Sequence, residues 1–316
     1  MPEIITCGET MVSFLPNDTV PLRYAGSFSM RYAGAESNTA IGLCRLGHSA
    51  GWVSRVGSDE FGRFLVQQIR GEGVETSRVE FDCNRPTGIM FKQFSAGKDT
   101  AVFYYRSGSA ASAMSAETPD YQYLSAAKIL HLTGITPALS NSCLAMTREL
   151  FRWAKQQKIL ISFDPNLRLK LWTKEQAVPV LRDLLFQCDI ALLGVQEAGV
   201  LLNTQVPDEI FDLLLQKGVQ KIGLKDGARG AWAADGRERI FINAYPAACV
   251  EPVGAGDAFN AGFLAGVLEN ASLLRCGQLA CGMGAYAVMG NGDIESLPAC
   301  RQELENYLDG MEPITR

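Results

Sequence analysis

Ile159-Leu160-Ile161-Ser162-Phe163 decides the fold class, because this stretch is apolar at nearly every position. A half-buried strand alternates apolar and polar residues, whereas a strand that is covered on both faces is apolar throughout. Three further runs share the pattern: Lys128-Ile129-Leu130-His131-Leu132-Thr133, Asp189-Ile190-Ala191-Leu192-Leu193 and Lys221-Ile222-Gly223-Leu224-Lys225. Helical patterns cover 140–157, 174–187, 196–202 and 301–308, and 256–289 has the composition of two closely packed helices. The alternation predicts an α/β fold with a parallel sheet between two helix layers.

Two regions interrupt this alternation and predict a second, smaller sheet. Residues 11–33 and 79–106 contain consecutive short strands, and Ser95-Ala96-Gly97-Lys98-Asp99 has the composition of a hairpin turn. We expect these two insertions to form a β lid. The main α/β domain then consists of residues 1–10, 34–78 and 107–316.

The composition excludes several classes of protein. The 316 residues include 29 Lys and Arg and 34 Asp and Glu, which gives a net charge of −5, and 47% are hydrophobic. These values describe a globular chain and argue against a general nucleic-acid binder. Residues 1–7 lack the pattern of a signal peptide, and no run approaches the roughly 18 apolar residues of a membrane span. We therefore expect a cytoplasmic protein with neither a nucleic-acid nor a membrane partner.

Cysteine and histidine residues offer little for metal binding. The nine Cys are scattered without a CxxC pair, which is typical of reduced thiols. Of the two His, His48 follows a predicted helix end and His131 stands in an apolar strand. A structural zinc site and histidine-based catalysis are therefore not expected.

Glu251-Pro252-Val253-Gly254-Ala255-Gly256-Asp257 is the sharpest candidate for chemistry. Small residues at 254–256 let backbone N–H groups approach a ligand, and the apolar run that follows indicates a helix. A helix N-terminus favours a phosphate or a developing negative charge. Asp257 beside it could take a proton from a substrate hydroxyl. The residues alone leave open that Asp257 only stabilises the helix start.

The segment from Lys225 to Gly230 allows two interpretations. A Gly-rich turn at the end of a strand could cradle nucleotide phosphates, but Asp226-Gly227 before Ala231-Trp232-Ala233 is also an ordinary hairpin turn. The chain has neither a P-loop pattern nor a dinucleotide fingerprint near its first strand.

Polar residues that follow other strands are expected at the same cleft, because ligands bind at the carboxyl ends of parallel strands. Arg168, at the end of Asp164-Pro165-Asn166-Leu167-Arg168, could grip a carboxylate or a phosphate. Tyr104-Tyr105-Arg106 ends a lid strand and could reach the same ligand. Glu197 opens a helix, where it could hold a metal-bound water or complement the helix dipole. From the residues alone, a solvated surface charge is the more usual role for each Arg.

Taken in order, these motifs resemble the ribokinase-like sugar kinases of the PfkB family over nearly the whole chain. Gly34-Ala35-Glu36-Ser37-Asn38 is similar to the N-terminal signature of that family, and Pro252-Val253-Gly254-Ala255-Gly256-Asp257 to its C-terminal signature. The resemblance implies a Rossmann-like α/β/α ribokinase fold with a small β-sheet lid. It also implies a kinase that uses ATP and Mg²⁺, and a homo-oligomer that forms through the lid.

Within the family, three segments look most like 2-keto-3-deoxygluconate kinases: residues 103–110, 131–140 and 164–172. The resemblance implies that Asp257 is the base and that the amides of Gly254, Ala255 and Gly256 form an anion hole. It implies that Gly34, Asn38, Tyr105, Arg106, Arg168 and Asp293 hold the sugar acid, with its carboxylate on the two arginines. Asn166, Lys225, Gly227 and Gly230 would line the ATP site, and Glu197 would serve the metal.

The sequence departs from the family pattern at three positions. Ala33-Gly34 replaces paired glycines, and Gly194 replaces the Asn of the Asn-x-x-Glu metal motif that ends at Glu197. Glu251 replaces the usual Asp, which puts in doubt the K⁺ site that some relatives have. Three alternatives remain: a fructokinase or another sugar-acid kinase of the family, a nicotinamide-dependent oxidoreductase, and a silent sugar-binding regulator.

Overall fold

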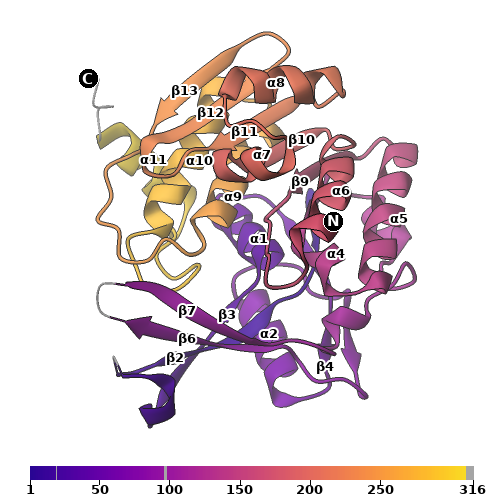
Figure 1. The fold of residues 1–316 in the computed structure, drawn as a ribbon, viewed down its shortest axis with the longest axis vertical. Coiled ribbons are helices and arrows are strands. Elements are labelled where there is room, and N and C mark those ends of the chain that lie inside the picture. The colour runs from indigo at the N-terminus through magenta and orange to yellow at the C-terminus, as the bar shows by residue number, and fades with distance from the viewer. Residues whose placement is uncertain (19, 96–97, 311–316) are drawn as a thin grey trace.

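The computed structural model describes residues 1–18, 20–95 and 98–310, and its described part contains two β-sheets (Figure 1). The large sheet has nine strands in the order β13-β12-β11-β10-β9-β8-β1-β4-β5, and the small sheet has four in the order β3-β2-β6-β7. The strands are β1 (Ile4–Cys7), β2 (Met11–Pro16), β3 (Phe28–Ala33), β4 (Ala50–Gly57), β5 (Val79–Asp82), β6 (Ile89–Ser95), β7 (Lys98–Tyr105), β8 (Ile129–Thr133), β9 (Leu160–Asp164), β10 (Ile190–Gly194), β11 (Lys221–Lys225), β12 (Gly230–Asp235) and β13 (Arg239–Asn243).

Helices cover both faces of the large sheet. They are α1 (Ala35–Arg45), α2 (Glu60–Gly71), α3 (Tyr121–Leu124), α4 (Ile135–Leu139), α5 (Asn141–Gln157), α6 (Lys174–Leu185), α7 (Val195–Leu201), α8 (Pro207–Gln216), α9 (Ala255–Leu268), α10 (Leu273–Ala287) and α11 (Arg301–Gly310). Successive strand residues enter opposite cores: Ile4 belongs to the core that contains residues of α1, α2, α9, α10 and α11, and Ile5 to the core that contains residues of α5, α6, α7 and α8. The predicted three-layer arrangement is therefore present.

Local sequence signals start the helices where the sequence indicates. The Ser140 hydroxyl accepts a hydrogen bond from the Cys143 amide at the start of α5, and Thr173 and Gln176 form a capping box at the start of α6. Helices α9 and α10 pack closely because Gly262 has no side chain: a Cβ there would lie 2.4 Å from the Leu279 carbonyl oxygen. In the described part of the chain, no helix is both long and apolar enough to span a membrane.

The small sheet combines residues of both predicted insertions, since β2 pairs antiparallel with β3 and parallel with β6, and β6 pairs antiparallel with β7. Figure 1 shows it beside α2, and Phe14 of β2 packs edge to face against Phe61 of that helix. The predicted hairpin turn at 95–99 includes residues 96 and 97, which lie outside the described residues. One assignment is wrong: β5 pairs with β4 at the edge of the large sheet. Its Val-Glu-Phe-Asp alternation is that of a strand with one exposed face, which the sequence cannot distinguish from a lid strand.

Candidate active site

A cavity of about 800 Å³ lies between the carboxyl ends of the large-sheet strands and the inner face of the small sheet. Asp164 ends β9, Gly194 ends β10 and Lys225 ends β11, so one edge of the parallel sheet supplies the floor. Met11, Met90, Val102 and Tyr104 line the cavity from the small sheet. Among the predicted site residues, the lining includes Gly34, Asn38, Arg106, Asn166, Arg168, Glu197, Lys225, Gly254, Gly256, Asp257 and Asp293.

The loop of residues 251–257, called the anion loop below, enters α9 through a backbone that only glycine tolerates. Gly254 precedes the helix with φ +86°, and a Cβ there would lie 2.5 Å from the Asp293 carbonyl oxygen. Amides in the first turn of a helix lack helical acceptors and are free to bind an anion. The Ala255 amide instead makes a long 3.4 Å bond to the Pro252 carbonyl. The amides of the residues that follow Ala255 in this turn are therefore freer to bind an anion.

Asp257 lies in the first turn of α9, buried beside this loop. Its Oδ2 accepts a hydrogen bond from Asn38 Nδ2 at 2.9 Å, and the same Nδ2 lies 3.3 Å from Asp293 Oδ2. Burial raises the pKa of Asp257 to about 7, with smaller contributions from the negative charges of Asp164 and Asp293. The group is thus poised near neutral pH, as a general base requires. Asn38 Oδ1 is buried without a hydrogen-bond partner among the described residues, which leaves an acceptor for a ligand hydroxyl.

Lys225 ends β11 and lines the floor of the cavity. Its Nζ lies 2.7 Å from Asp164 Oδ2 and 3.2 Å from Asn260 Oδ1, and Asn260 Nδ2 donates to Asp164 at 2.7 Å. Burial opposes the ionisation of Asp164, but Lys225 and Asn260 outweigh it and lower the pKa of that carboxyl. A Cβ on Gly256 would lie 3.7 Å from Lys225 Nζ, so this ammonium adjoins the anion loop.

Glu197 joins two loops through its carboxylate. Oε1 accepts the Leu167 amide at 2.7 Å and Oε2 accepts the Gly194 amide at 3.0 Å. Burial and the charge of Asp164 raise the pKa of Glu197. In residues 1–18, 20–95 and 98–310, no three His, Cys, Asp or Glu side chains gather into a metal cluster. The carboxylate that is predicted to serve a metal also holds the backbone of the cavity floor in place.

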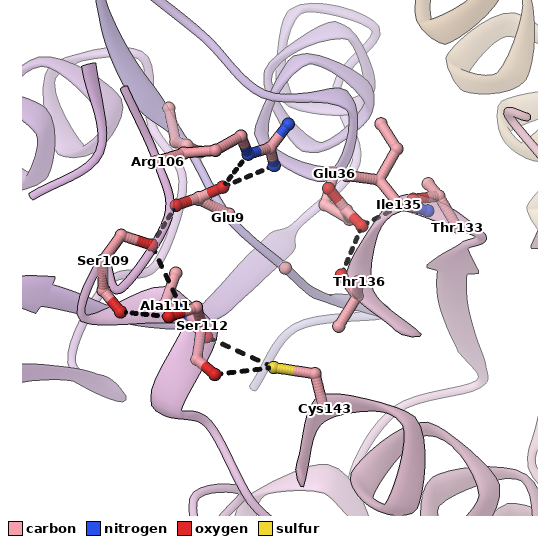
Figure 2. Close-up of polar contacts among 12 residues, drawn as sticks. Glu9, Glu36, Arg106, Ser109, Ala111, Ser112, Thr133, Ile135, Thr136 and Cys143 are labelled. Atoms are coloured by element: carbon pink, nitrogen blue, oxygen red, sulfur yellow. Dashed lines mark hydrogen bonds and ion pairs between the residues drawn. The ribbon is translucent and has the colours of Figure 1, made fainter. Parts of the chain in front are cut away.

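The two predicted carboxylate-binding arginines differ in their surroundings. Arg106 is buried and its Nε donates to Glu9 Oε2 at 2.6 Å, with Nη2 on the same oxygen, while Ser109 Oγ donates to Glu9 Oε1 at 2.5 Å (Figure 2). Glu9 therefore neutralises Arg106, and a contact of Arg106 with the substrate carboxylate stays a prediction. Arg168 is exposed at the cavity and forms no hydrogen bond or ion pair with any side chain that the structure describes.

Four further predicted residues are not part of the cavity lining: Ala255, Tyr105, Gly227 and Gly230. Tyr105 is 65% exposed and packs against Phe91, while its neighbour Tyr104 lines the cavity, because side chains alternate along β7. Gly227 and Gly230 form the turn between β11 and β12, which pair antiparallel. The segment is therefore a hairpin turn whose glycines lie outside the cavity lining, and a contact between these glycines and the nucleotide stays a prediction.

Sequence reasoning missed Lys92 and Glu9. Lys92 is buried between Glu251 and Asp293, at 3.1 Å and 3.0 Å from their carboxylates. The sequence does contain a sign of this buried lysine: in Ile89-Met90-Phe91-Lys92, a lysine stands at an inward-facing position of an apolar strand. Glu9 lies two residues after the end of β1, near the carboxyl end of that strand. Its partner is 97 residues away, a distance that local patterns do not span.

Comparison with known proteins supports the resemblance seen in the sequence. Residues 1–300 match the model of the pfkB family of carbohydrate kinases. The chain is 35% identical over 315 residues to the 2-dehydro-3-deoxygluconokinase of Bacillus subtilis (strain 168), covering 99% of this chain and 97% of that protein. It is 34% identical over 309 residues to the 2-dehydro-3-deoxygluconokinase of Thermoproteus tenax, covering 96% and 94%.

Comparison of the fold with solved structures also finds a protein of this family. The crystal structure of a PfkB protein from Polaromonas sp. JS666 superposes with a TM-score of 0.88 at 34% identity, covering 96% of this chain and 99% of that one. This chain therefore combines a match to the family model over residues 1–300 with the strand order, the small sheet and the anion loop described above. The protein therefore belongs to the PfkB family of carbohydrate kinases and has the ribokinase-like fold of an ATP-dependent sugar kinase.

Proposed function

We propose that this kinase transfers the γ-phosphoryl group of ATP to the terminal hydroxyl of 2-keto-3-deoxygluconate, also called 2-dehydro-3-deoxygluconate. The observation that supports it most is the buried carboxyl of Asp257, with a pKa of about 7, in the first turn of α9 beside the anion loop. The choice of substrate is supported by the names of two relatives that are 34–35% identical over nearly the whole chain.

In the proposed step, an Asp257 carboxylate oxygen accepts the proton of the substrate hydroxyl. The resulting oxygen nucleophile forms a bond to the γ-phosphorus, and the bond from that phosphorus to the bridging oxygen breaks and leaves ADP. The amides of residues 254–256 and the Lys225 ammonium stabilise the negative charge on the transferring group. Asn38 presents its unpartnered Oδ1 to a sugar hydroxyl, and Gly34 and Asp293 complete this end of the cavity.

The proposal includes Mg²⁺. This ion usually keeps several water ligands and binds through one or two carboxylates together with substrate phosphates, so it needs no preformed cage of side chains. Asp164 and Glu197 are carboxylates that line the cavity close to Lys225, and they fit such an ion through bridging water. When bound, Mg²⁺ neutralises charge on the phosphate oxygens. Asn166 also lines the cavity. It is our candidate for contact with the nucleotide.

The pH dependence of kcat/KM should report the ionisation of Asp257. Its pKa is raised to about 7, so below that pH the carboxyl carries a proton and cannot accept another from the substrate. We therefore expect kcat/KM to fall with decreasing pH through an apparent pKa near 7. Initial rates across neutral pH would measure it, with circular dichroism as the control for folding. A profile that is flat through this range would remove Asp257 as the base.

Arg168→Ala should separate acidic from neutral sugars. Arg168 is the cavity arginine without a partner among the described side chains, so we expect it to bind the substrate carboxylate. Loss of one charge-assisted contact, worth about 1.5–3 kcal/mol, should raise KM for the sugar acid roughly 10- to 150-fold. The KM for fructose, which has no carboxylate, should stay unchanged.

Lys170→Ala is the matched control for this variant. Lys170 is an exposed cation of the same loop, and its Nζ already donates to the Val102 carbonyl at 3.1 Å. We expect it to change KM for the acid far less than Arg168→Ala does. An unchanged KM for the sugar acid in Arg168→Ala would take this residue out of the substrate site.

We also expect the protein to form a homo-oligomer through the outer face of the small sheet. Phe103 and Tyr105 are 46% and 65% exposed on the face opposite Val102 and Tyr104. Adjacent exposed aromatic side chains are typical of surfaces that bind another protein.

A further inference from the structure

Lys92 is a buried cation that the small sheet inserts into the main domain. Its side chain is only 1% exposed, and Met90 and Lys92 lie on the inward face of β6. The ammonium lies 3.1 Å from Glu251 Oε1 and 3.0 Å from Asp293 Oδ1. Burial opposes this charge, but Asp293 and Glu251 outweigh burial and raise the pKa of Lys92. The small sheet therefore supplies a fixed positive charge.

The two partners of Lys92 belong to the two segments that shape the anion loop. Glu251 begins the loop, and its Oε2 accepts the Gly292 amide at 3.2 Å. Asp293 supports the middle of the loop, because Gly254 packs directly against its backbone. Asp293 Oδ2 also lies 3.3 Å from Asn38 Nδ2, which donates to the Asp257 carboxylate. Lys92 thus contacts the anion loop directly at Glu251 and connects to the base through Asp293 and then Asn38.

The two buried carboxylates, Glu251 and Asp293, depend on Lys92 for compensation of their negative charge. Glu251 is 2% and Asp293 is 7% exposed, so neither carboxylate can rely on water for solvation. Two uncompensated buried carboxylates would repel each other and the negative charge that gathers during phosphoryl transfer. One ammonium between them removes most of this repulsion and fixes the distance between the two segments.

We propose that Lys92 is a positioning residue of the phosphoryl-transfer site: its ammonium is the built-in cation that holds Glu251 and Asp293 against the anion loop, so that no dissolved monovalent cation is needed there. This inference rests on the proposed function, because it assigns Lys92 a role in the step at Asp257. Glu251, where the sequence departs from the family, then has a partner of its own in the small sheet.

Arg31 provides a matched control from the same two parts of the molecule. Its Nε lies 3.1 Å from Glu295 Oε1, so it also joins the small sheet to the segment that contains Asp293. This pair is exposed, at 49% for Arg31 and 32% for Glu295, and exposed ion pairs contribute little. Arg31→Ala removes one cationic bridge between sheet and segment without removing a buried charge.

The test compares wild type, Lys92→Ala, Lys92→Met and Arg31→Ala by ADP release with the sugar acid and Mg-ATP. Each is assayed in sodium, potassium and tetramethylammonium salts at one ionic strength, and with added n-propylammonium, which has the size of the deleted side chain. We expect the same wild-type kcat in all three salts. We expect Lys92→Ala in tetramethylammonium to lose about 100-fold in kcat, since small misplacements of reacting groups have effects of this size.

Rescue distinguishes a missing charge from a damaged fold. Potassium or n-propylammonium should restore part of the kcat of Lys92→Ala, because a cation can enter the space that the side chain leaves. Neither should restore Lys92→Met, whose uncharged side chain fills that space. Arg31→Ala should behave like wild type in every salt.

Three results would overturn the proposal. They are a several-fold stimulation of the wild type by potassium, a wild-type kcat in Lys92→Ala, and a folded Lys92→Ala that no cation rescues. If Lys92→Ala does not fold, the salt comparison of the wild type decides. Failure of the proposed function would look different: the wild type itself would release no ADP with the sugar acid.

Discussion

Asp257→Asn should lower kcat by about three orders of magnitude, the effect expected when a general base is removed. The substitution keeps the size of the side chain, and its amide oxygen can still accept the hydrogen bond that Asn38 donates to Asp257. What it removes is the carboxylate that takes the proton. Coupled measurement of ADP release at saturating ATP and sugar acid gives kcat directly.

Binding of ATP is the control for this variant, because the proposed nucleotide contacts come from Lys225, Asn166 and the loop amides. Calorimetric titration should give a similar Kd for wild type and Asp257→Asn. A variant that keeps more than a tenth of the wild-type kcat would show that proton transfer to Asp257 is not part of the step.

Arg106→Ala should lower the free energy of unfolding by about 3–5 kcal/mol, as is typical when one partner of a buried ion pair is removed. Glu9 is 2% exposed, and in this variant its Oε2 keeps no partner. Urea denaturation followed by tryptophan fluorescence would measure the change. The effect is on stability as well as on substrate binding, because Glu9 already neutralises Arg106 (Figure 2).

Arg168→Ala is the control, since Arg168 is exposed and we expect its loss to change stability by no more than about 0.5 kcal/mol. The double variant Glu9→Gln with Arg106→Met should be more stable than Arg106→Ala, because it leaves no buried charge. If Arg106→Ala unfolds at the same urea concentration as wild type, the pair with Glu9 does not stabilise the fold.

The central parallel strands, the packed helices α9 and α10 and the small sheet could be predicted because each has a local pattern. Residues 160–164 and 190–194 are apolar at nearly every position, and such runs occur where both faces of a sheet are covered. The edge strand β5 was assigned to the wrong sheet because its alternation is shared by any strand with one exposed face.

In the candidate site, too, features that form a local pattern could be predicted, and contacts between distant parts of the chain could not. The anion loop and Asp257 were visible because glycines, a carboxylate and a helix start are adjacent in the chain. The pairing of Arg106 with Glu9 and of Lys92 with Glu251 was not visible, since 97 and 159 residues separate the partners. Which of Tyr104 and Tyr105 faces the cavity depends on the register of β7, and a shift of one residue reverses it.

Direct measurement of the phosphoryl acceptor tests the central proposal most sharply. Wild type would be incubated with Mg-ATP and either 2-keto-3-deoxygluconate or fructose, with ADP release followed by a coupled assay and the product identified by mass spectrometry and phosphorus NMR. We predict one phosphate ester at the terminal carbon of the sugar acid for each ADP released, and far slower turnover of fructose. Equal turnover of fructose, or ADP release without a phosphorylated acid, would contradict the proposal.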